Sequence, residues 1–157
     1  NTGTIDGHLS IEDGNIGGII GWLDKGHKFE YNESYCTLSN TRAPGTNGTS
    51  EVGGLIGQHG NYDSCPGEGR GCKVRCDISY DYSNEKWYGM LLGYFWSTHT
   101  VVLGTEDEPI IVLGGSMTYS GGTTQITAEN YTKYTNHSSA GGNSGSKPFT
   151  VHVKFGE

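Results

Sequence analysis

The chain has 157 residues, 27 of them glycine and 4 proline, and its net charge is -7 with only 10 lysines and arginines. This glycine content is unsuited to a helical bundle, because each glycine inside a helix costs about 1 kcal/mol relative to alanine. The sequence has no basic cluster of the kind that binds nucleic acid, and no apolar run near the roughly 20 residues that span a bilayer. We therefore expect neither nucleic-acid binding nor a membrane-spanning segment.

The N-terminal segment alternates between apolar and polar residues. Ile5, Leu9 and Ile11 share one face, which predicts a strand with one apolar side. We interpret residues 1–12 as a strand that docks on its own sheet or is exchanged with a neighbouring molecule, with these three residues at the contact. The chain begins at Asn1 without a methionine or an apolar leader, which is typical of a processed or a trimmed chain.

Short strands are predicted through the middle of the chain, at residues 16–23, 28–32, 34–39, 51–59 and 72–82. The last of these alternates most clearly, because Cys72, Val74, Cys76 and Ile78 share one parity and charged residues occupy the other. We therefore expect an inside and an outside face in this strand.

Residues 87–96 are apolar on both parities, which predicts a strand buried on both faces. In a single-layered sheet the second face must meet a loop of the same chain, a ligand or another subunit. We predict that Tyr88, Tyr94 and Trp96 on this face form a contact surface.

Glycine stops follow the strands in the C-terminal half. The β-branched runs 101–103 and 110–113 each end at a glycine, and a third run follows Gly121 and Gly122. This pattern is typical of an antiparallel sheet whose consecutive strands are neighbours. Residues 131–147 are polar and glycine-rich and predict a loop, and the alternation at 149–155 predicts a last strand.

The whole chain, residues 1–157, is expected to be one all-β domain: an antiparallel barrel of about eight strands, or else a β-sandwich. Residues 111–122 place an apolar strand before a glycine pair, then Tyr119, then a second glycine pair. This order, with its surroundings at residues 51–129, resembles the allene oxide cyclase and dirigent β-barrel superfamily. The family's GGTG is replaced here by Gly114-Gly115-Ser116-Met117. The resemblance implies an eight-stranded antiparallel barrel, often trimeric and with a cavity, but no catalytic residue of that family matches a position here.

Four cysteines predict two disulfides if the protein is extracellular. We prefer Cys65 with Cys72, which would close a flexible glycine-rich loop, and Cys36 with Cys76. A bond between Cys72 and Cys76 is disfavoured, because on one strand they would stand about 13 Å apart, beyond the reach of a disulfide. A zinc site made of all four thiolates is the alternative, but the usual CxxC pairs are absent.

Four sequons fit the N-glycosylation pattern and lie in polar stretches, at Asn32, Asn47, Asn130 and Asn136. Together with the cysteines they favour a secreted glycoprotein.

No catalytic constellation is found in the sequence, which therefore favours a role other than catalysis. Glu106, Asp107 and Glu108 could bind calcium, but a solvated turn that ends at Pro109 is the preferred interpretation. The six histidines lack metal-binding spacing, so neither a metal nor a cofactor is predicted.

Three functions follow from these features. The preferred one is a secreted, N-glycosylated structural module that self-associates into an extracellular oligomer or fibril. The first alternative is a dirigent-like or cyclase-like barrel that binds a small hydrophobic molecule. The second is a lectin, which predicts an exposed tryptophan or tyrosine beside acidic and amide side chains on a shallow surface.

Overall fold

The computed structural model of the protein describes residues 3–11, 14–23, 28–40, 50–59, 67–80, 88–95, 101–119, 122–135 and 149–156. These residues form strands, turns and one short 3-10 helix, η1 (Tyr131–Lys133). The prediction of an all-β fold is confirmed. Within the described ranges, no helix is long and apolar enough to cross a membrane.

Four sheets make up the fold. The long sheet contains β1 (Gly3–Ile11), β5 (Asn32–Asn40), β9 (Lys73–Tyr80) and β13 (Ile110–Tyr119). The second sheet contains β2 (Gly14–Gly17), β6 (Ser50–Gly53) and β10 (Tyr88–Gly89), and the third contains β3 (Ile20–Leu23), β7 (Ile56–His59) and β11 (Leu92–Phe95). The fourth sheet contains β4 (Lys28–Glu30), β8 (Gly67–Arg70), β12 (Val101–Leu103) and β15 (Phe149–Val151).

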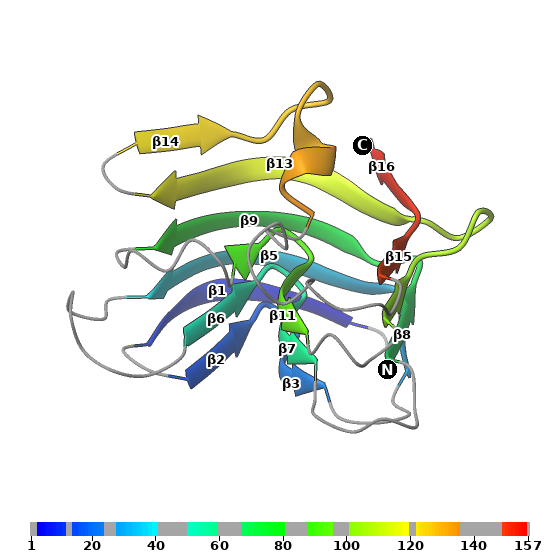
Figure 1. The fold of residues 1–157 in the computed structure, drawn as a ribbon, viewed down its shortest axis with the longest axis horizontal. Coiled ribbons are helices and arrows are strands. Elements are labelled where there is room, and N and C mark those ends of the chain that lie inside the picture. Colours follow the sequence, from blue (N-terminus) through cyan, green and yellow to red (C-terminus); the bar gives the residue numbers. More distant parts are fainter. Residues whose placement is uncertain are drawn as a thin grey trace.

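Neighbouring strands in these four sets run parallel. The chain visits the four sheets in order and then returns to the long sheet, so each circuit lies against the one before it (Figure 1). The architecture is a parallel β-solenoid. We call its circuits the first coil (β1 to β4), the second coil (β5 to β8), the third coil (β9 to β12) and the fourth coil, which begins with β13.

The predicted antiparallel barrel is wrong, and so is the barrel that the dirigent-like resemblance implied. The sheets are not closed into a barrel, and consecutive strands belong to different sheets. A short strand followed by glycine marks a hairpin in a barrel but a corner in a solenoid, and the local pattern is the same in both. Only β13 and β14 (Gly122–Gln125), around the second glycine pair, form the expected antiparallel pair among the described strands.

Two of the predicted strands are each divided by such a corner. Residues 51–59 form β6 and β7, with Gly54 and Leu55 between them. Residues 149–155 form β15 and β16 (Val153–Phe155), with His152 between them. The backbone of His152 donates to the carbonyl oxygen of Leu103 and accepts from the amide of Ile110, so the corner joins two different sheets.

An internal repeat explains the corners. The segments IGGIIGW, VGGLIGQ and YGMLLGY begin at positions 16, 52 and 88, which are 36 residues apart. Each segment crosses from the second sheet to the third, and its hydrogen bonds recur from coil to coil. Gly18 donates its amide to the carbonyl oxygen of Gly53 at 3.1 Å, and Gly54 donates to that of Gly89 at 3.0 Å. We call these three segments the corner repeats.

Glycine is required in the corner repeats because two backbones approach closely there. A Cβ atom added to Gly53 would collide with the carbonyl oxygen of Ile56 and would lie 2.8 Å from the amide nitrogen of Gly93. Any side chain at this position would push the second and third sheets apart.

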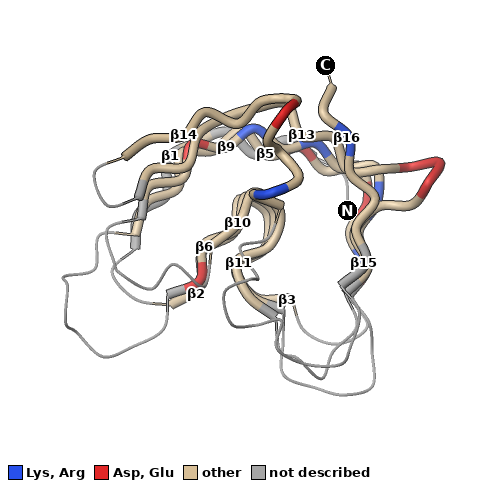
Figure 2. The backbone as a smooth tube through the Cα atoms, turned by 45° about the horizontal axis from the view of Figure 1, so that its top comes forward, with Lys and Arg blue, Asp and Glu red and all other residues tan. Residues whose placement is uncertain are grey.

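The corner repeats pack beneath the long sheet (Figure 2). At this contact the long sheet contributes small side chains, with the sulfur of Cys76 3.6 Å from the carbonyl oxygen of Gly54. Larger side chains complete the core, and the following are fully buried: Leu38, Val52, Leu55, Ile56, Ile78, Met90, Leu91, Leu92, Leu103 and Ile110. The inside face that the sequence predicted for residues 72–78 is confirmed.

The edge of the fourth coil is covered by C-terminal segments. β14 pairs with the second half of β13, and β16 pairs with its first half. Residues 134 and 135 lie next to the third corner repeat, in the place that a fourth corner repeat would take. There Met90 donates its amide to the carbonyl oxygen of Tyr134 at 2.6 Å. The predicted polar loop at 131–147 therefore contains an ordered part at 131–135, and its remainder lies outside the described residues.

The edge of the first coil is open in the part of the chain that the structure describes. There β1, β2, β3 and β4 each pair with one neighbour only, the corresponding strand of the second coil. The predicted N-terminal strand is thus docked on its own chain, in register with β5 from Gly3 opposite Asn32 to Ile11 opposite Asn40.

Candidate binding groove and coil-spanning contacts

A groove of about 230 Å³ crosses β4, β8 and β12 on the fourth sheet. Alternate residues of a strand point to opposite faces, so the residues on either side of Phe29 and Gly69 form the walls. One wall contains Lys28, Glu68 and Val102, and the other contains Glu30, Arg70 and Thr105. The groove therefore runs across the strands, from coil to coil.

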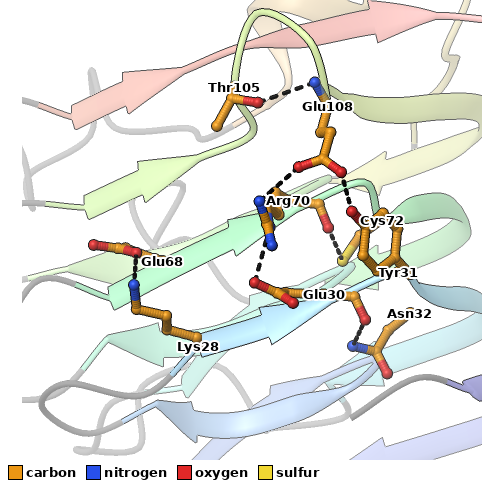
Figure 3. A network of polar contacts seen from close by, with 9 residues as sticks. All are labelled: Lys28, Glu30, Tyr31, Asn32, Glu68, Arg70, Cys72, Thr105 and Glu108. Atoms are coloured by element: carbon orange, nitrogen blue, oxygen red, sulfur yellow. Dashed lines mark hydrogen bonds and ion pairs between the residues drawn. The ribbon is translucent and has the colours of Figure 1, made fainter.

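Ion pairs occupy both walls. The Nζ atom of Lys28 lies 2.6 Å from a carboxylate oxygen of Glu68, and the Nε atom of Arg70 lies 2.8 Å from Glu30 (Figure 3). Arg70 also contacts Glu108 through Nη1 at 2.8 Å. Glu30, Arg70 and Glu108 belong to successive coils, so their charges alternate along the stack.

Tyr31 lies beside these charges at the corner between the fourth sheet and the long sheet. Its φ angle is +54°, a left-handed conformation that is rare for a tyrosine. Gly71 occupies the equivalent corner of the second coil with φ +60°, and a Cβ there would lie 2.6 Å from the Tyr31 ring. Because Gly71 has no side chain, the ring can extend across the second coil, where its hydroxyl donates to the Glu108 carboxylate (Figure 3).

The acidic segment at residues 106–108 forms the predicted turn. The amide of Thr105 donates to the carbonyl oxygen of Glu108 at 3.0 Å, and the Thr105 hydroxyl accepts from the amide of Glu108. The turn joins β12 to β13, two strands of different sheets. In the described parts of the chain, no group of three or more acidic, histidine or cysteine side chains could hold a metal ion.

Cys36 and Cys76 occupy opposing positions of β5 and β9. The hydroxyl of Ser34 lies 3.6 Å from the sulfur of Cys36 and 3.3 Å from that of Cys76. The contact with Cys36, and then burial, raise the pKa of the Cys76 thiol. The structure contains Cys36, Cys72 and Cys76 as reduced thiols, so neither predicted disulfide is formed in it, and Cys65 lies outside the described residues.

Of the predicted contact surface formed by Tyr88, Tyr94 and Trp96, Tyr88 is internal and Tyr94 is partly buried. Tyr88 is only 6% exposed, and Leu91 and Leu92 donate their amides to the carbonyl oxygen of Thr135, so the chain itself covers this segment. Burial, and then the charge of Glu51, raise the pKa of the partly buried Tyr94. Trp96 and the side chains of Ile5, Leu9 and Ile11 lie outside the described parts.

The predicted glycosylation sites differ in their accessibility. Asn32 is 3% exposed and donates its Nδ2 to the carbonyl oxygen of Glu30, so this fold has no room for a glycan there. Asn130 lies near the surface, where Nδ2 donates to Gln125 and would keep one hydrogen for this bond after glycosylation. Asn47 and Asn136 lie outside the described residues.

Sequence reasoning missed the contacts among Glu30, Tyr31, Arg70 and Glu108. The corner repeats could have been found from their 36-residue spacing. The charged corner gives no such signal, because loops of different length precede it and its residues are separated by 40 and then 38 positions (30, 70 and 108). Comparison with family models, curated proteins and solved structures finds no match to this chain.

Proposed function

We propose that this chain is a secreted, non-catalytic structural module that self-associates through the open edge of its first coil. The carrying observation is the difference between the two ends of the solenoid. β14 and β16 cover β13, whereas β1 has a described neighbour on one side only.

An open strand edge favours association because its amide and carbonyl groups need partners. β1 is nine residues long, and β2, β3 and β4 continue the same edge through the other sheets. Long edges of this kind pair with other chains unless they are covered. A second copy of the chain supplies a matching set of donors and acceptors.

The covered end of the solenoid determines the polarity of association. Head-to-tail stacking would place the first coil of one copy against the fourth coil of the next, where β14 and β16 already pair with β13. Two first coils related by a two-fold axis meet no such obstacle, and a two-fold interface is self-complementary. The proposal is therefore a dimer in which the two β1 strands lie side by side and antiparallel.

Two proline variants of β1 test this dimer. Successive amides of a strand point to opposite sides in the plane of the sheet, so Gly7→Pro and His8→Pro each remove an amide from a different edge. One variant should disrupt the pairing with β5 and destabilise the fold. The other should remain folded by circular dichroism and become monomeric by light scattering. The proposal would be falsified by a wild-type protein that is monomeric at all concentrations. It would also be falsified if both proline variants remained folded and dimeric.

Secretion is supported by the sequons at Asn47, Asn130 and Asn136 and by the opposed cysteines. In an oxidising compartment, Cys36 and Cys76 are proposed to form a disulfide, because neighbouring strands lie about 4.8 Å apart and disulfides join Cα atoms at about 4.4–6.8 Å. The proposed Cys65–Cys72 bond completes the set. Glycosylation of the three sequons is tested by glycosidase digestion and mass spectrometry of the secreted protein.

A further inference from the structure

We propose that the groove on the fourth sheet binds a neutral carbohydrate. The groove lies on the side-chain face of the fourth sheet, whereas self-association uses the backbone edge of the first coil, to which β4 also belongs. The inference therefore does not rest on self-association. It is carried by the shape of the groove, by the arrangement of charge on its walls and by the position of Tyr31.

The shape of the groove suits a single sugar ring. Its walls are side chains two residues apart on the same strand, which places them roughly 6.6 Å apart. The volume of about 230 Å³ lies below the range of about 300–1,000 Å³ that holds drug-sized ligands. Because the groove crosses successive coils, a chain of sugars can continue along the solenoid beyond the ring that is held.

The charges of the walls select a neutral, hydroxyl-rich ligand. Lys28 faces Glu68 along one wall, and Arg70 faces Glu30 along the other, so positive and negative groups alternate both along and across the groove. A hydroxyl group both donates and accepts, and can therefore bind a carboxylate and a cation at once. At the first and second coils, an ionic ligand would meet a like charge on one of the two walls.

The existing ion pairs do not prevent binding. The charged groups of the walls are between 36% and 63% exposed, so the pairs are weak, and replacing one partner by a hydroxyl costs little free energy. In the unliganded protein, one pair lies on each wall of the groove.

Tyr31 provides an aromatic surface beside the groove. It contacts Arg70, whose guanidinium carbon lies 5.9 Å from the ring centroid, and 45% of the residue is exposed. Gly71 supports one side of the ring and Glu108 holds its hydroxyl. A fixed aromatic ring binds the apolar face of a sugar with little loss of side-chain entropy.

The test is calorimetric titration of the whole chain with neutral pentasaccharides, using maltopentaose, cellopentaose and N-acetylchitopentaose. Oligogalacturonate and deacetylated chito-oligosaccharide serve as anionic and cationic comparisons. Val102→Trp fills the groove without removing a charge, and Arg70→Ala removes one cation from its wall. Lys73→Ala is the matched control, because Lys73 forms an exposed ion pair with Glu33 on the long sheet, away from the groove.

We expect at least one neutral pentasaccharide to bind, with affinity weakened about tenfold or more by Val102→Trp and Arg70→Ala and unchanged by Lys73→Ala. Thermal unfolding of each variant separates loss of the site from loss of the fold. The inference is overturned if no neutral sugar binds at about 10 mM, if a charged oligosaccharide binds more tightly, or if a folded Val102→Trp variant binds like the wild type.

Discussion

Tyr31 of the first coil donates its hydroxyl hydrogen bond to Glu108, which follows the fourth-sheet strand of the third coil. One side chain therefore joins two coils that are not neighbours, by crossing the coil between them at Gly71. In a solenoid, most contacts link adjacent repeats only. This bond adds a contact of longer range at the corner between the fourth sheet and the long sheet.

Removal of the Tyr31 hydroxyl should destabilise the fold. We expect Tyr31→Phe to lower the free energy of unfolding by about 1 kcal/mol, because the ring stays on Gly71 while the hydrogen bond to a carboxylate is lost. The measurement is urea denaturation. Tyr35→Phe is the matched control, since the Tyr35 hydroxyl binds Glu33 at 3.0 Å within its own strand. Equal effects of the two substitutions would show that the hydrogen bond between coils contributes no more to the free energy of unfolding than one within a strand.

The corner repeats should not tolerate a methyl group. We expect Gly53→Ala to lower the free energy of unfolding by about 3 kcal/mol, because the new Cβ collides with the backbone of the next strand. Gly7→Ala is the control: nothing lies within 4 Å of a Cβ at Gly7, so its effect should stay within about 0.5 kcal/mol. Similar thermal stability of the two variants would contradict the close approach at Gly53.

The opposed thiols should join when an oxidant is supplied. With oxidised glutathione, the Cys36 and Cys76 thiols lose two protons and two electrons and form one disulfide, while glutathione is reduced to two thiols. Mass mapping without reductant should find these two peptides joined. The bond should add about 3–4 kcal/mol to the free energy of unfolding, and Cys36→Ser should abolish the gain. Joining of Cys36 to any other cysteine would refute the register between β5 and β9.

The Glu33 carboxyl on the outer face of the long sheet should titrate at unusually low pH. Its hydrogen bond to Lys73, and then that to Tyr35, lower its pKa. A carboxyl whose pKa is lowered by folding stabilises the protein above its unfolded pKa, and this contribution disappears as the pH falls through the folded pKa. The window therefore lies below about pH 4.5. Carbon-detected NMR titration should show the low value in the wild type and a rise toward the ordinary value in Lys73→Ala.

The faces of the strands could be predicted from sequence, and their partners could not. Alternation at residues 72–78 correctly placed Val74, Cys76 and Ile78 inside, because side-chain direction depends only on local geometry. The same alternation does not predict which strand pairs with residues 72–78. The pairing of Cys36 with Cys76 spans a full coil, and a choice between an antiparallel neighbour and a parallel one requires recognition of the repeat.

The candidate groove was beyond sequence reasoning for a related reason. Lys28 and Glu68 meet because β4 and β8 pair with Lys28 opposite Glu68. Neither segment has a sequence pattern that predicts the other as its partner. The lectin hypothesis, which stays a prediction, named an exposed tryptophan or tyrosine beside acidic and amide side chains, and Tyr31 is exposed and hydrogen-bonded to Glu108. Its left-handed backbone and its passage over Gly71 depend on the stacking of coils.

The corner repeats have a consequence for how this molecule can vary in length. Their backbone hydrogen bonds join equivalent atoms at each step, and the glycine contacts recur at the same places. A duplicated unit of 36 residues placed between the second and third coils would find a complementary backbone on both sides at the corner repeats, and it would separate Tyr31 from Glu108. Duplication or deletion of one 36-residue unit can therefore change the length of the solenoid by one coil at a time, because the backbone contacts of the corner repeats are the same at each step.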